Sequence, residues 1–366
     1  MIASTLQRNV FVDFGHTVIW PNHYILLIGP TGNAKSSAVA IGEDLLRECG
    51  TVNVLPEEIS KQAIVKELRR AKMDEDGNIK SEDSTGLLIA TELTDFLGKD
   101  NYKRGLVPFL TNLYDGKLDY RDAKITREGT ALKNVCFSFL GATTSEWLTE
   151  LAPTSVFTGG FMGRVVVVGA LSRRYNFMPP RRDPHVRSEL AEDLRAMAAW
   201  KGKVQIEQDA LVPLEDHSRA VYGGHGLAVD DERAEGWYAR KEAHTLKLCL
   251  ALAASHGHTS IERSVVEEAL GILYDVELKM MSVYDRIDVT EGHKKRERII
   301  EALVKADVEE GLSSRDIWRK VGHRFDTMKE FEECLRGLRE VEKVEMVSTE
   351  GVGRPTYLYK LILRKE

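Results

Sequence analysis

Short apolar runs recur along the first 170 residues, and stretches with a helical pattern separate them. The clearest runs cover residues 24–28, 52–55, 86–90, 135–140 and 165–168. Continuous apolar runs are typical of strands that are buried on both faces, and intervening helices are typical of parallel connections. The pattern therefore predicts an α/β fold with a mostly parallel sheet.

The pattern changes after about residue 170. A stretch at residues 179–184 contains three prolines and is typical of a linker. Beyond it, residues 186–200 and 232–285 have predominantly helical patterns, and a second break is expected near residues 288–293. We therefore expect three parts. They are a core at 1–170, a helical lid at 171–290 and a C-terminal domain at 291–366.

The C-terminal part has the order helix, helix, helix and two short strands, which predicts a winged helix. The expected elements include helices at 315–321 and 327–341 and wing strands at 344–348 and 356–361. Ser313 and Ser314 are suited to cap the first of these helices, and the second would occupy the position of a DNA-recognition helix. Arg354, in the turn of the wing, is a candidate DNA contact. Acidic residues on the recognition helix leave a protein-docking role equally open.

Composition narrows the class of protein. The chain has 366 residues, 43% of them hydrophobic and 30% charged, which suits a globular protein of two or three domains. The formal net charge of −6 excludes a uniformly basic coat, so any nucleic-acid contact must come from local basic segments. The four cysteines are scattered and predict free thiols in a reducing compartment. We see no membrane-spanning run and expect no membrane partner.

The first apolar run leads into a candidate phosphate-binding loop. The run at 24–28 enters a tight turn that ends in Lys35 and Ser36, and a helix follows. In such a loop, backbone N–H groups wrap a polyphosphate, the lysine reaches the β- and γ-phosphates, and the hydroxyl helps to hold Mg²⁺. The candidate nucleotide-binding residues are Gly29, Pro30, Thr31, Gly32, Asn33, Ala34, Lys35, Ser36 and Ser37. Ala34 departs from the usual pattern, which has Gly there, and we expect it to adopt helical φ and ψ angles. The alternative is an ordinary strand–turn–helix.

The run at 86–90 ends in a polar pair, Thr91 and Glu92. A nucleotide hydrolase needs a carboxylate at such a strand end to orient or deprotonate the attacking water. Glu92 is the candidate, and with Ser36 it would also serve Mg²⁺, partly through water. The preceding residue is usually Asp, whereas Thr91 carries no charge. The alternative is a surface glutamate at a strand end.

Two further positions fit the same chemistry. Thr143 follows the run at 135–140 and is suited to sense a γ-phosphate, although a turn-forming threonine is the alternative. Arg164 comes directly after a Gly-rich turn and before the run at 165–168, which suggests an arginine finger acting on a neighbouring subunit. A structural arginine that binds carbonyls is the alternative, and Arg173 and Arg174 are less favoured candidates for the finger.

Taken in order, these residues resemble the AAA+ helicase lineage, in particular the ATPase core of minichromosome maintenance (MCM) helicases. Arg164 matches the arginine of that family's Ser-Arg-Phe triplet, and Arg240 matches the later arginine that opens a lid helix, at the sensor 2 position. A closer resemblance is to helicase-like ATPases of phages and mobile elements, the DUF3987 (YfjI-like) family. It rests on Trp20, a Leu-Tyr-Asp-Gly turn at 113–116 and a Gly-Phe-x-x-Arg turn at 160–164, and the likeness covers roughly residues 10–275.

The resemblance implies a P-loop AAA+ ATPase core with a helical lid, using ATP and Mg²⁺. It implies an oligomeric ring, expected to be a hexamer, that translocates on DNA or unwinds it during phage or mobile-element replication in the cytoplasm of a bacterial host. Replication proteins are possible partners through the winged helix. A helicase loader, or a nucleotide-gated DNA-binding scaffold with little hydrolysis, are the alternatives.

A candidate DNA-binding hairpin precedes the run at 135–140. In the helicases that this chain resembles, an insertion at this place lines the ring pore and grips single-stranded DNA. Lys117, Arg121, Lys124 and Arg127 are candidate phosphate contacts, and Tyr120 is available to stack on a base. Interspersed acidic residues leave a solvated hairpin of mixed charge as the alternative.

Overall fold

The computed structural model describes most of the chain. The described residues are 1–70, 83–93, 96, 105–116, 119–120, 132–145, 148, 160–170, 183–223, 234–304, 306, 311–340, 344–349 and 356–361. The chain divides into two compact units, Met1–Tyr284 and Asp285–Glu366. The predicted core and nearly all of the predicted lid therefore lie in one unit.

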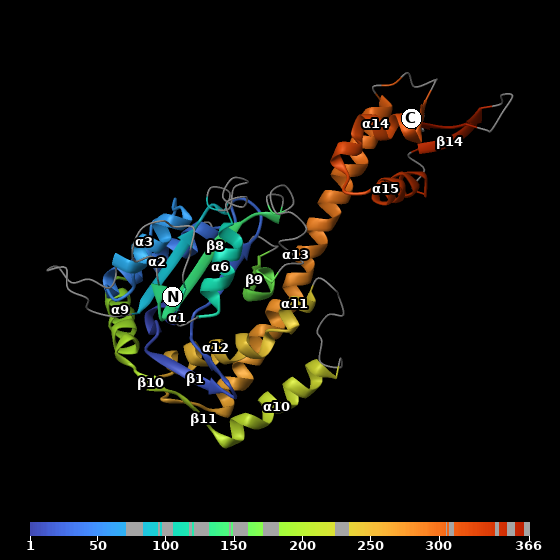
Figure 1. The fold of residues 1–366 in the computed structure, drawn as a ribbon. Helices are drawn as coiled ribbons and strands as arrows, with labels where there is room; N and C mark the ends of the chain where they lie inside the picture. The colour runs from blue at the N-terminus through green and yellow to red at the C-terminus, as the bar shows by residue number, and fades with distance from the viewer. Residues whose placement is uncertain are drawn as a thin grey trace. The chain divides into compact units, whose positions relative to one another are not determined.

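A five-stranded parallel sheet forms the centre of the first unit (Figure 1). In spatial order its strands are β4 (Val54–Leu55), β5 (Ser84–Ala90), β8 (Val135–Thr143), β3 (Tyr24–Ile28) and β9 (Val165–Gly169). All five predicted runs are strands of this sheet, and all neighbours pair in parallel. The predicted α/β class with a parallel sheet is confirmed. All carboxyl ends therefore meet at one edge, which is where loops gather in folds of this kind.

Helices cover both faces of the sheet. On one face, α2 (Lys35–Cys49) and α9 (Pro184–Ala199) bury a cluster that includes Leu87 and Ile89 of β5. On the other face lie α3 (Lys61–Arg70) and α6 (Leu106–Tyr114). There Tyr24 packs edge-on against Tyr114 and donates its hydroxyl to the Leu110 carbonyl at 2.7 Å. The strands are buried on both sides, which explains their continuous apolar sequence.

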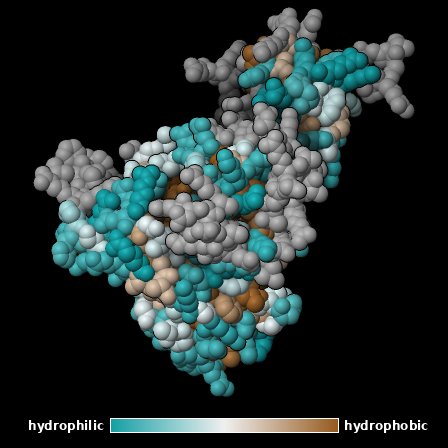
Figure 2. Space-filling model, turned by 60° about the vertical axis from the view of Figure 1, so that its left-hand side comes forward, coloured by the Kyte–Doolittle hydropathy of each residue, from teal (hydrophilic) through white to brown (hydrophobic). Residues whose placement is uncertain are grey.

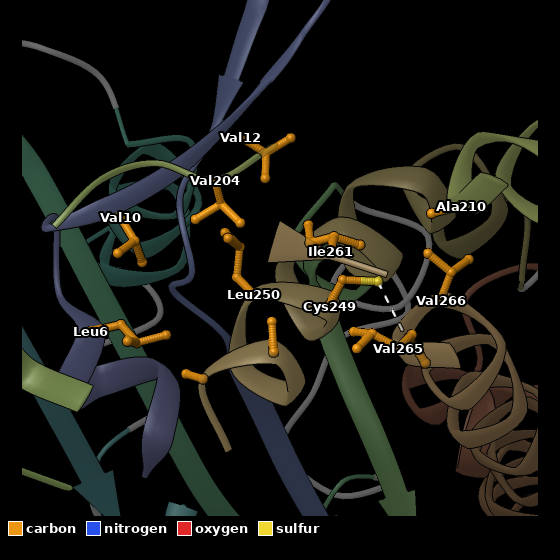
Figure 3. Packing of buried hydrophobic residues seen from close by; sticks show 13 residues of the cluster. Leu6, Val10, Val12, Val204, Ala210, Cys249, Leu250, Ile261, Val265 and Val266 are labelled. Carbon is orange, nitrogen blue, oxygen red and sulfur yellow. Dashed lines mark hydrogen bonds between the residues drawn. The ribbon is translucent and has the colours of Figure 1, made fainter. Parts of the chain in front are cut away.

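A second hydrophobic cluster joins the start of the chain to its helical part (Figure 3). Leu6, Val10 and Val12 meet Val204 and Leu250 in this cluster. The remaining elements at the start of the chain and in its helical part are α1 (Ile2–Leu6), β1 (Val10–Phe14), β2 (Thr17–Ile19), β10 (Gly202–Lys203), β11 (Gln205–Ile206), α10 (Gln208–Tyr222), α11 (Glu235–Tyr238), α12 (Lys241–Ser255), β12 (Ser260–Ile261) and α13 (Arg263–Val304). Strand β1 pairs with β10 in parallel, so the first strand of the chain is bonded to the helical region rather than to the central sheet.

Two helices differ from the expectations. Helix α10 has no counterpart in the predicted pattern, and it contains Pro213, which lacks the backbone N–H of a helix interior. The break expected near residues 288–293 is wrong, because α13 continues through this stretch to Val304. A single glycine there costs only about 1 kcal/mol relative to alanine, which the residues on either side outweigh.

The second unit combines helices with a small antiparallel sheet. Its elements after α13 are β13 (Leu312–Ser313), α14 (Ser314–Val321), a short 3-10 turn at Gly322–Arg324, α15 (Met328–Glu340), β14 (Val344–Thr349) and β15 (Thr356–Leu361). The sheet order is β13-β15-β14. Ser313 caps α14, since its hydroxyl accepts from the Asp316 amide at 3.2 Å, as predicted. The core includes Ile317, Phe331 and Leu335.

The face drawn in Figure 2 is largely hydrophilic, with small, scattered hydrophobic areas. No helix among the described residues combines the length and the apolar composition that crossing a bilayer requires.

Candidate nucleotide site

The predicted phosphate loop connects the end of β3 to the start of α2 at the carboxyl edge of the sheet. The Gly29 amide donates to the Thr143 carbonyl at 3.3 Å, and Asn33 Nδ2 donates to the Ala170 carbonyl at 2.7 Å. A Cβ atom on Gly29 would lie 2.6 Å from that same carbonyl, so only glycine fits. The loop is therefore held against the ends of two neighbouring strands.

Ala34 takes a left-handed backbone conformation, with φ 54° and ψ 22°, and serves as the N-cap of α2. The expectation of helical angles is wrong at this position. The turn needs a positive φ before the helix can begin, which explains why the usual motif has glycine there. A non-glycine residue in this region carries a cost of about 1–2 kcal/mol. The backbone at Ala34 is therefore strained.

Lys35 is the first residue of α2, and its ammonium group lies over the loop. Lys35 Nζ donates to the carbonyls of Gly29 at 2.6 Å and Pro30 at 3.0 Å. Ser36 and Ser37 follow in the first turn of the same helix, whose N-terminal N–H groups and positive dipole end favour an anion. The loop thus places a cation, hydroxyl groups and helix N–H groups at one place.

A cavity of about 380 Å³ lies over this loop. It is lined by the loop, the end of β5 and the end of β8, through Thr31, Gly32, Asn33, Ala34, Lys35, Ser36, Ser37, Thr91, Glu92, Leu93, Ala142, Thr143 and Thr144. The predicted Lys35, Ser36, Glu92 and Thr143 therefore lie around one cavity. Its volume is in the usual range for small-molecule sites. Hydroxyl and carboxylate oxygens are the ligands that Mg²⁺ prefers, so the residues fit a magnesium-bound nucleotide.

Glu57 is a residue of this edge that sequence analysis missed. It follows β4, the neighbour of β5, and its Oε1 atom accepts hydrogen bonds from the end of β5. The signal was present, because the apolar run at 52–55 is followed by Pro56 and Glu57, and carboxyl ends of parallel strands meet at one edge. A larger cavity of about 790 Å³ lies between α2 and residues 50–57, and Thr91 lines both cavities.

Arg164 lies at the opposite edge of the sheet. Tyr24 pairs with Val165 and Ile28 with Gly169, so Arg164 stands before the amino end of β9. The whole of β3 separates this level from the phosphate loop, a span of roughly 17 Å at about 3.3 Å per residue. The structure thus brings Lys35, Glu92 and Thr143 together, but not Arg164 with them.

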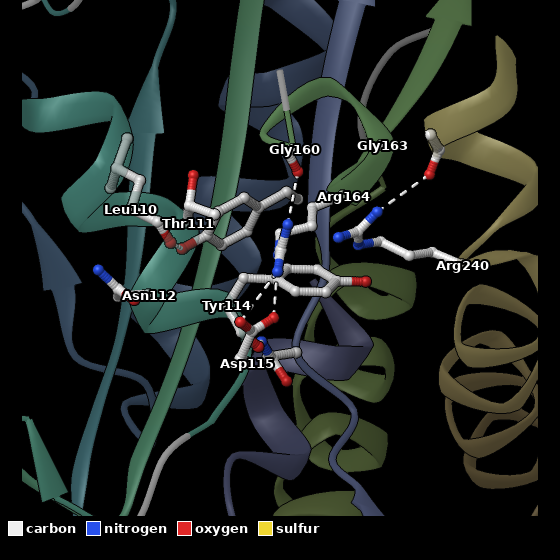
Figure 4. Close-up of polar contacts among 12 residues, drawn as sticks. Leu110, Thr111, Asn112, Tyr114, Asp115, Gly160, Gly163, Arg164 and Arg240 are labelled. Carbon is white, nitrogen blue, oxygen red and sulfur yellow. Dashed lines mark hydrogen bonds and ion pairs between the residues drawn. The ribbon is translucent and has the colours of Figure 1, made fainter. Parts of the chain in front are cut away.

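The Arg164 guanidinium forms a two-pronged ion pair with Asp115, at 2.9 Å for both contacts (Figure 4). Its third bond goes to the Gly160 carbonyl at 2.6 Å, and the side chain is 11% exposed. Arg240 lies beside it at the N-cap position of α12, without a side-chain cap bond. Burial and repulsion by Arg164 lower the pKa of Arg240, while Asp115 opposes the shift. Arg164 is thus paired with Asp115, whereas Arg240 donates to the Gly236 carbonyl at 3.2 Å.

Helix α12 is bonded to the motifs that carry the family resemblance. Lys247 Nζ donates to the Trp20 carbonyl at 3.0 Å and to the carbonyl and side-chain oxygen of Asn22 at 2.9 and 2.6 Å. Burial lowers the pKa of Lys247 to about 7. A ring nitrogen of His244 bonds to the Gly163 carbonyl at 2.9 Å, and burial lowers its pKa to about 4. These motif residues form one buried polar network that joins the Arg164 turn to α12.

The base of the predicted DNA-binding hairpin is present. Strands β6 (Asp119–Tyr120) and β7 (Leu132–Lys133) pair in antiparallel fashion, with Tyr120 opposite Leu132. The other candidate DNA contacts lie outside the described residues. They are Lys117, Arg121, Lys124, Arg127 and Arg354, and the alternative fingers Arg173 and Arg174 also lie there.

The thiols are free, as predicted. Cys49, Cys136 and Cys249 are buried, and burial raises the pKa of Cys136 to about 11 and that of Cys249 to about 12.

Among the residues that the structure describes, no group of three or more His, Cys, Asp or Glu side chains is arranged to hold a metal ion. Comparison of the sequence with protein-family models and with curated proteins gives no match.

Proposed function

We propose that the protein binds and hydrolyses ATP with Mg²⁺ at the 380 Å³ cavity over the phosphate loop. The observation that carries this proposal is the convergence of Lys35, Ser36, Glu92 and Thr143, which come from separate parts of the sequence, on that one cavity. All four were chosen for this chemistry from the sequence. The parallel sheet explains why the strand ends meet, and the support for the proposal is the combination of a cation, hydroxyl groups and a carboxylate around the cavity.

Each residue has a role that follows from its chemistry. The loop N–H groups and Lys35 bind the phosphates, and Ser36 holds the metal ion, which supplies charge neutralisation when it is bound. Glu92 is exposed at the end of β5 and is placed to orient a water molecule or take its proton. Thr143 lines the same cavity, and its hydroxyl would serve as a contact for the terminal phosphate.

We further propose that hydrolysis requires assembly of a ring, expected to be hexameric. Arg164 and Arg240 are the remaining candidate catalytic residues, and the register of β9 against β3 separates Arg164 from its own phosphate loop by the length of the sheet. Both arginines are thus better placed to reach the nucleotide of a neighbouring chain. The Asp115 pair would hold Arg164 in a fixed orientation for that contact. A purely structural arginine is the competing role, which the bond to the Gly160 carbonyl favours.

The DNA part of the proposal is a translocase or helicase that acts in replication of a phage or mobile element, in the cytoplasm of a bacterial host. The antiparallel base formed by β6 and β7 supports a hairpin at the place that the resemblance implies for a pore loop. The helix, strand, helix, helix and hairpin order of the second unit supports a winged helix that binds DNA or replication proteins.

The alternative is a nucleotide-gated DNA-binding scaffold with little hydrolysis. Two observations favour it. Ala34 holds the phosphate loop in a strained left-handed conformation, and Thr91 lacks the negative charge that the strand end usually carries. A helicase loader would share the same site.

Separate measurements of binding and turnover with Glu92→Gln test the proposal. The amide cannot accept the water's proton, so hydrolysis should fall by at least about 100-fold while ATP affinity stays within about threefold. Glu58→Gln, the same change at an exposed glutamate, serves as the control and should hydrolyse ATP as the wild type does. Near-normal turnover by Glu92→Gln would exclude Glu92 as the water-activating residue, and no turnover by the wild type would favour the scaffold.

A further inference from the structure

One carboxylate oxygen binds the end of β5 at three points. Glu57 Oε1 accepts from the Thr91 hydroxyl at 2.6 Å, from the Glu92 amide at 3.0 Å and from the Thr91 amide. Glu57 is half-buried, and hydrogen bonds to a charged acceptor are roughly twice as strong as neutral ones. The polypeptide at Thr91 and Glu92 is therefore held from the neighbouring strand.

The topology explains how Glu57 reaches this place. Strand β4 lies next to β5 in parallel, with Leu55 opposite Leu88. Strand β4 ends at Leu55, whereas β5 continues two residues beyond Leu88 to Ala90. Glu57 stands two residues beyond Leu55, so the segment after β4 passes the level at which β5 ends. A carboxylate that follows β4 therefore meets the residues that follow β5.

Glu57 contacts Thr91, which stands at a position that usually carries a negative charge. A nucleotide hydrolase commonly has an aspartate before its water-activating glutamate, and this chain has Thr91 there. The Thr91 hydroxyl donates its hydrogen to Glu57, so the strand end carries a neutral side chain that is hydrogen-bonded to a carboxylate. The negative charge is present at this edge, but a different strand supplies it.

We propose that Glu57 replaces the missing carboxylate at position 91. It is a positioning residue that holds Thr91 through two hydrogen bonds and the Glu92 amide through a third. Its charge favours a nucleotide with bound Mg²⁺ over metal-free nucleotide. This inference rests on the proposed ATP site. It makes the Thr91 substitution compatible with a working hydrolase, because the charge has moved and has not been lost.

The competing explanation is that Glu57 only holds the loop as a hydrogen-bond acceptor. Glu57→Gln separates the two, because the amide oxygen can accept the same three bonds while the charge is lost. Thr91→Asp in the Glu57→Gln background then restores a carboxylate at the strand end. Glu58→Gln removes a neighbouring exposed charge and serves as the matched control.

The measurement is the equilibrium affinity for a fluorescent, non-hydrolysable ATP analogue with excess Mg²⁺ and with chelator. The ratio of the two affinities measures how much Mg²⁺ strengthens nucleotide binding. We expect Glu57→Gln to lower this ratio by about tenfold, the size of a lost charge-assisted interaction. The double variant should return it to within about threefold of wild type, and Glu58→Gln should leave it unchanged. Thermal melts of all variants check that each is folded.

An unchanged ratio in Glu57→Gln would overturn the proposal, and so would a lowered ratio that Thr91→Asp does not restore. Absence of binding by the wild type under both conditions would instead remove the proposed ATP site itself. Because the result is a ratio within one variant, a change in the folded fraction does not imitate it.

Discussion

At the scale of single residues, Ala34 shows how a departure from a motif is accommodated. The sequence alone suggested that alanine would join the helix, but the turn demands a left-handed residue before Lys35. The requirement belongs to the backbone path between β3 and α2, which no local propensity encodes. The Ala34 side chain therefore strains the backbone of the loop. The free energy of unfolding gained by removing this side chain can be measured.

Ala34→Gly should stabilise the protein by about 1 kcal/mol, because glycine adopts a positive φ without steric cost. Ala38→Gly is the matched control on the same helix. Ala38 is exposed in the interior of α2, where glycine should destabilise by about 1 kcal/mol. Denaturant unfolding of the three proteins would show shifts of opposite sign. Destabilisation by both variants would contradict the strain at Ala34.

Lys247 is a second residue with a strong local effect. Its ammonium group is buried and bonded to three oxygens of Trp20 and Asn22. Burial opposes the charge and lowers the pKa to about 7, below the 10.5 of an ordinary lysine. Between these values the unfolded chain binds a proton that the folded protein does not, so this group makes stability rise with pH.

Lys247→Met should destabilise the protein by about 3 kcal/mol near pH 7, because it leaves buried oxygens without donors. It should also remove the pH dependence that Lys247 contributes. The stability difference between wild type and variant should therefore grow by about 1 kcal/mol per pH unit between pH 7 and 8.5. Chemical denaturation at several pH values measures this difference. A constant or shrinking difference would mean that Lys247 stays charged in the fold.

At the scale of elements, the sequence predicts the central strands, but it predicts only some of the candidate functional residues at their carboxyl ends. The five apolar runs are buried on both faces, which makes them continuous in the sequence. Residues that immediately follow a long run, such as Glu92 and Thr143, could be found in the same way. Glu57 follows the short strand β4, and its role depends on strand order, which the sequence does not reveal. The Asp115–Arg164 pair joins two turns that lie 49 residues apart.

The hairpin between β6 and β7 gives the element-scale prediction. If it grips a DNA backbone, the double variant Lys124→Ala with Arg127→Ala should weaken binding to single-stranded DNA of any sequence. The slope of log affinity against log salt should fall by about 0.7 for each lost phosphate contact. Asp122→Asn, which removes a negative charge from the same hairpin, should not weaken binding. Loss confined to one DNA sequence at a constant salt slope would contradict a backbone grip.

At the scale of the whole molecule, the two groups of candidate catalytic residues lie at opposite edges of one sheet. Lys35, Glu92 and Thr143 surround the cavity at the carboxyl edge, whereas Arg164 and Arg240 meet at the other. A single chain does not bring these groups together. In the proposed ring, each interface would pair the cavity of one chain with the arginines of the next, and activity would then depend on assembly.

Mixing of two inactive variants tests this arrangement. Lys35→Ala should bind the nucleotide much more weakly, and Arg164→Ala should bind ATP but hydrolyse it at least about 1,000-fold more slowly. Mixed rings would contain interfaces with both an intact loop and an intact arginine, so the mixture should regain measurable activity. Wild-type activity should also rise faster than linearly with protein concentration. Linear activity and no recovery on mixing would assign Arg164 a structural role.

The central claim is that the cavity over the phosphate loop binds ATP with Mg²⁺, and a direct titration decides it. Lys35 is the cation of that loop, so wild type should bind the nucleotide saturably and Lys35→Ala should bind about 100-fold more weakly, the loss expected for a charged contact to phosphate. Both proteins should melt at similar temperatures. Equal affinity of the two proteins, or no binding by the folded wild type, would contradict the account.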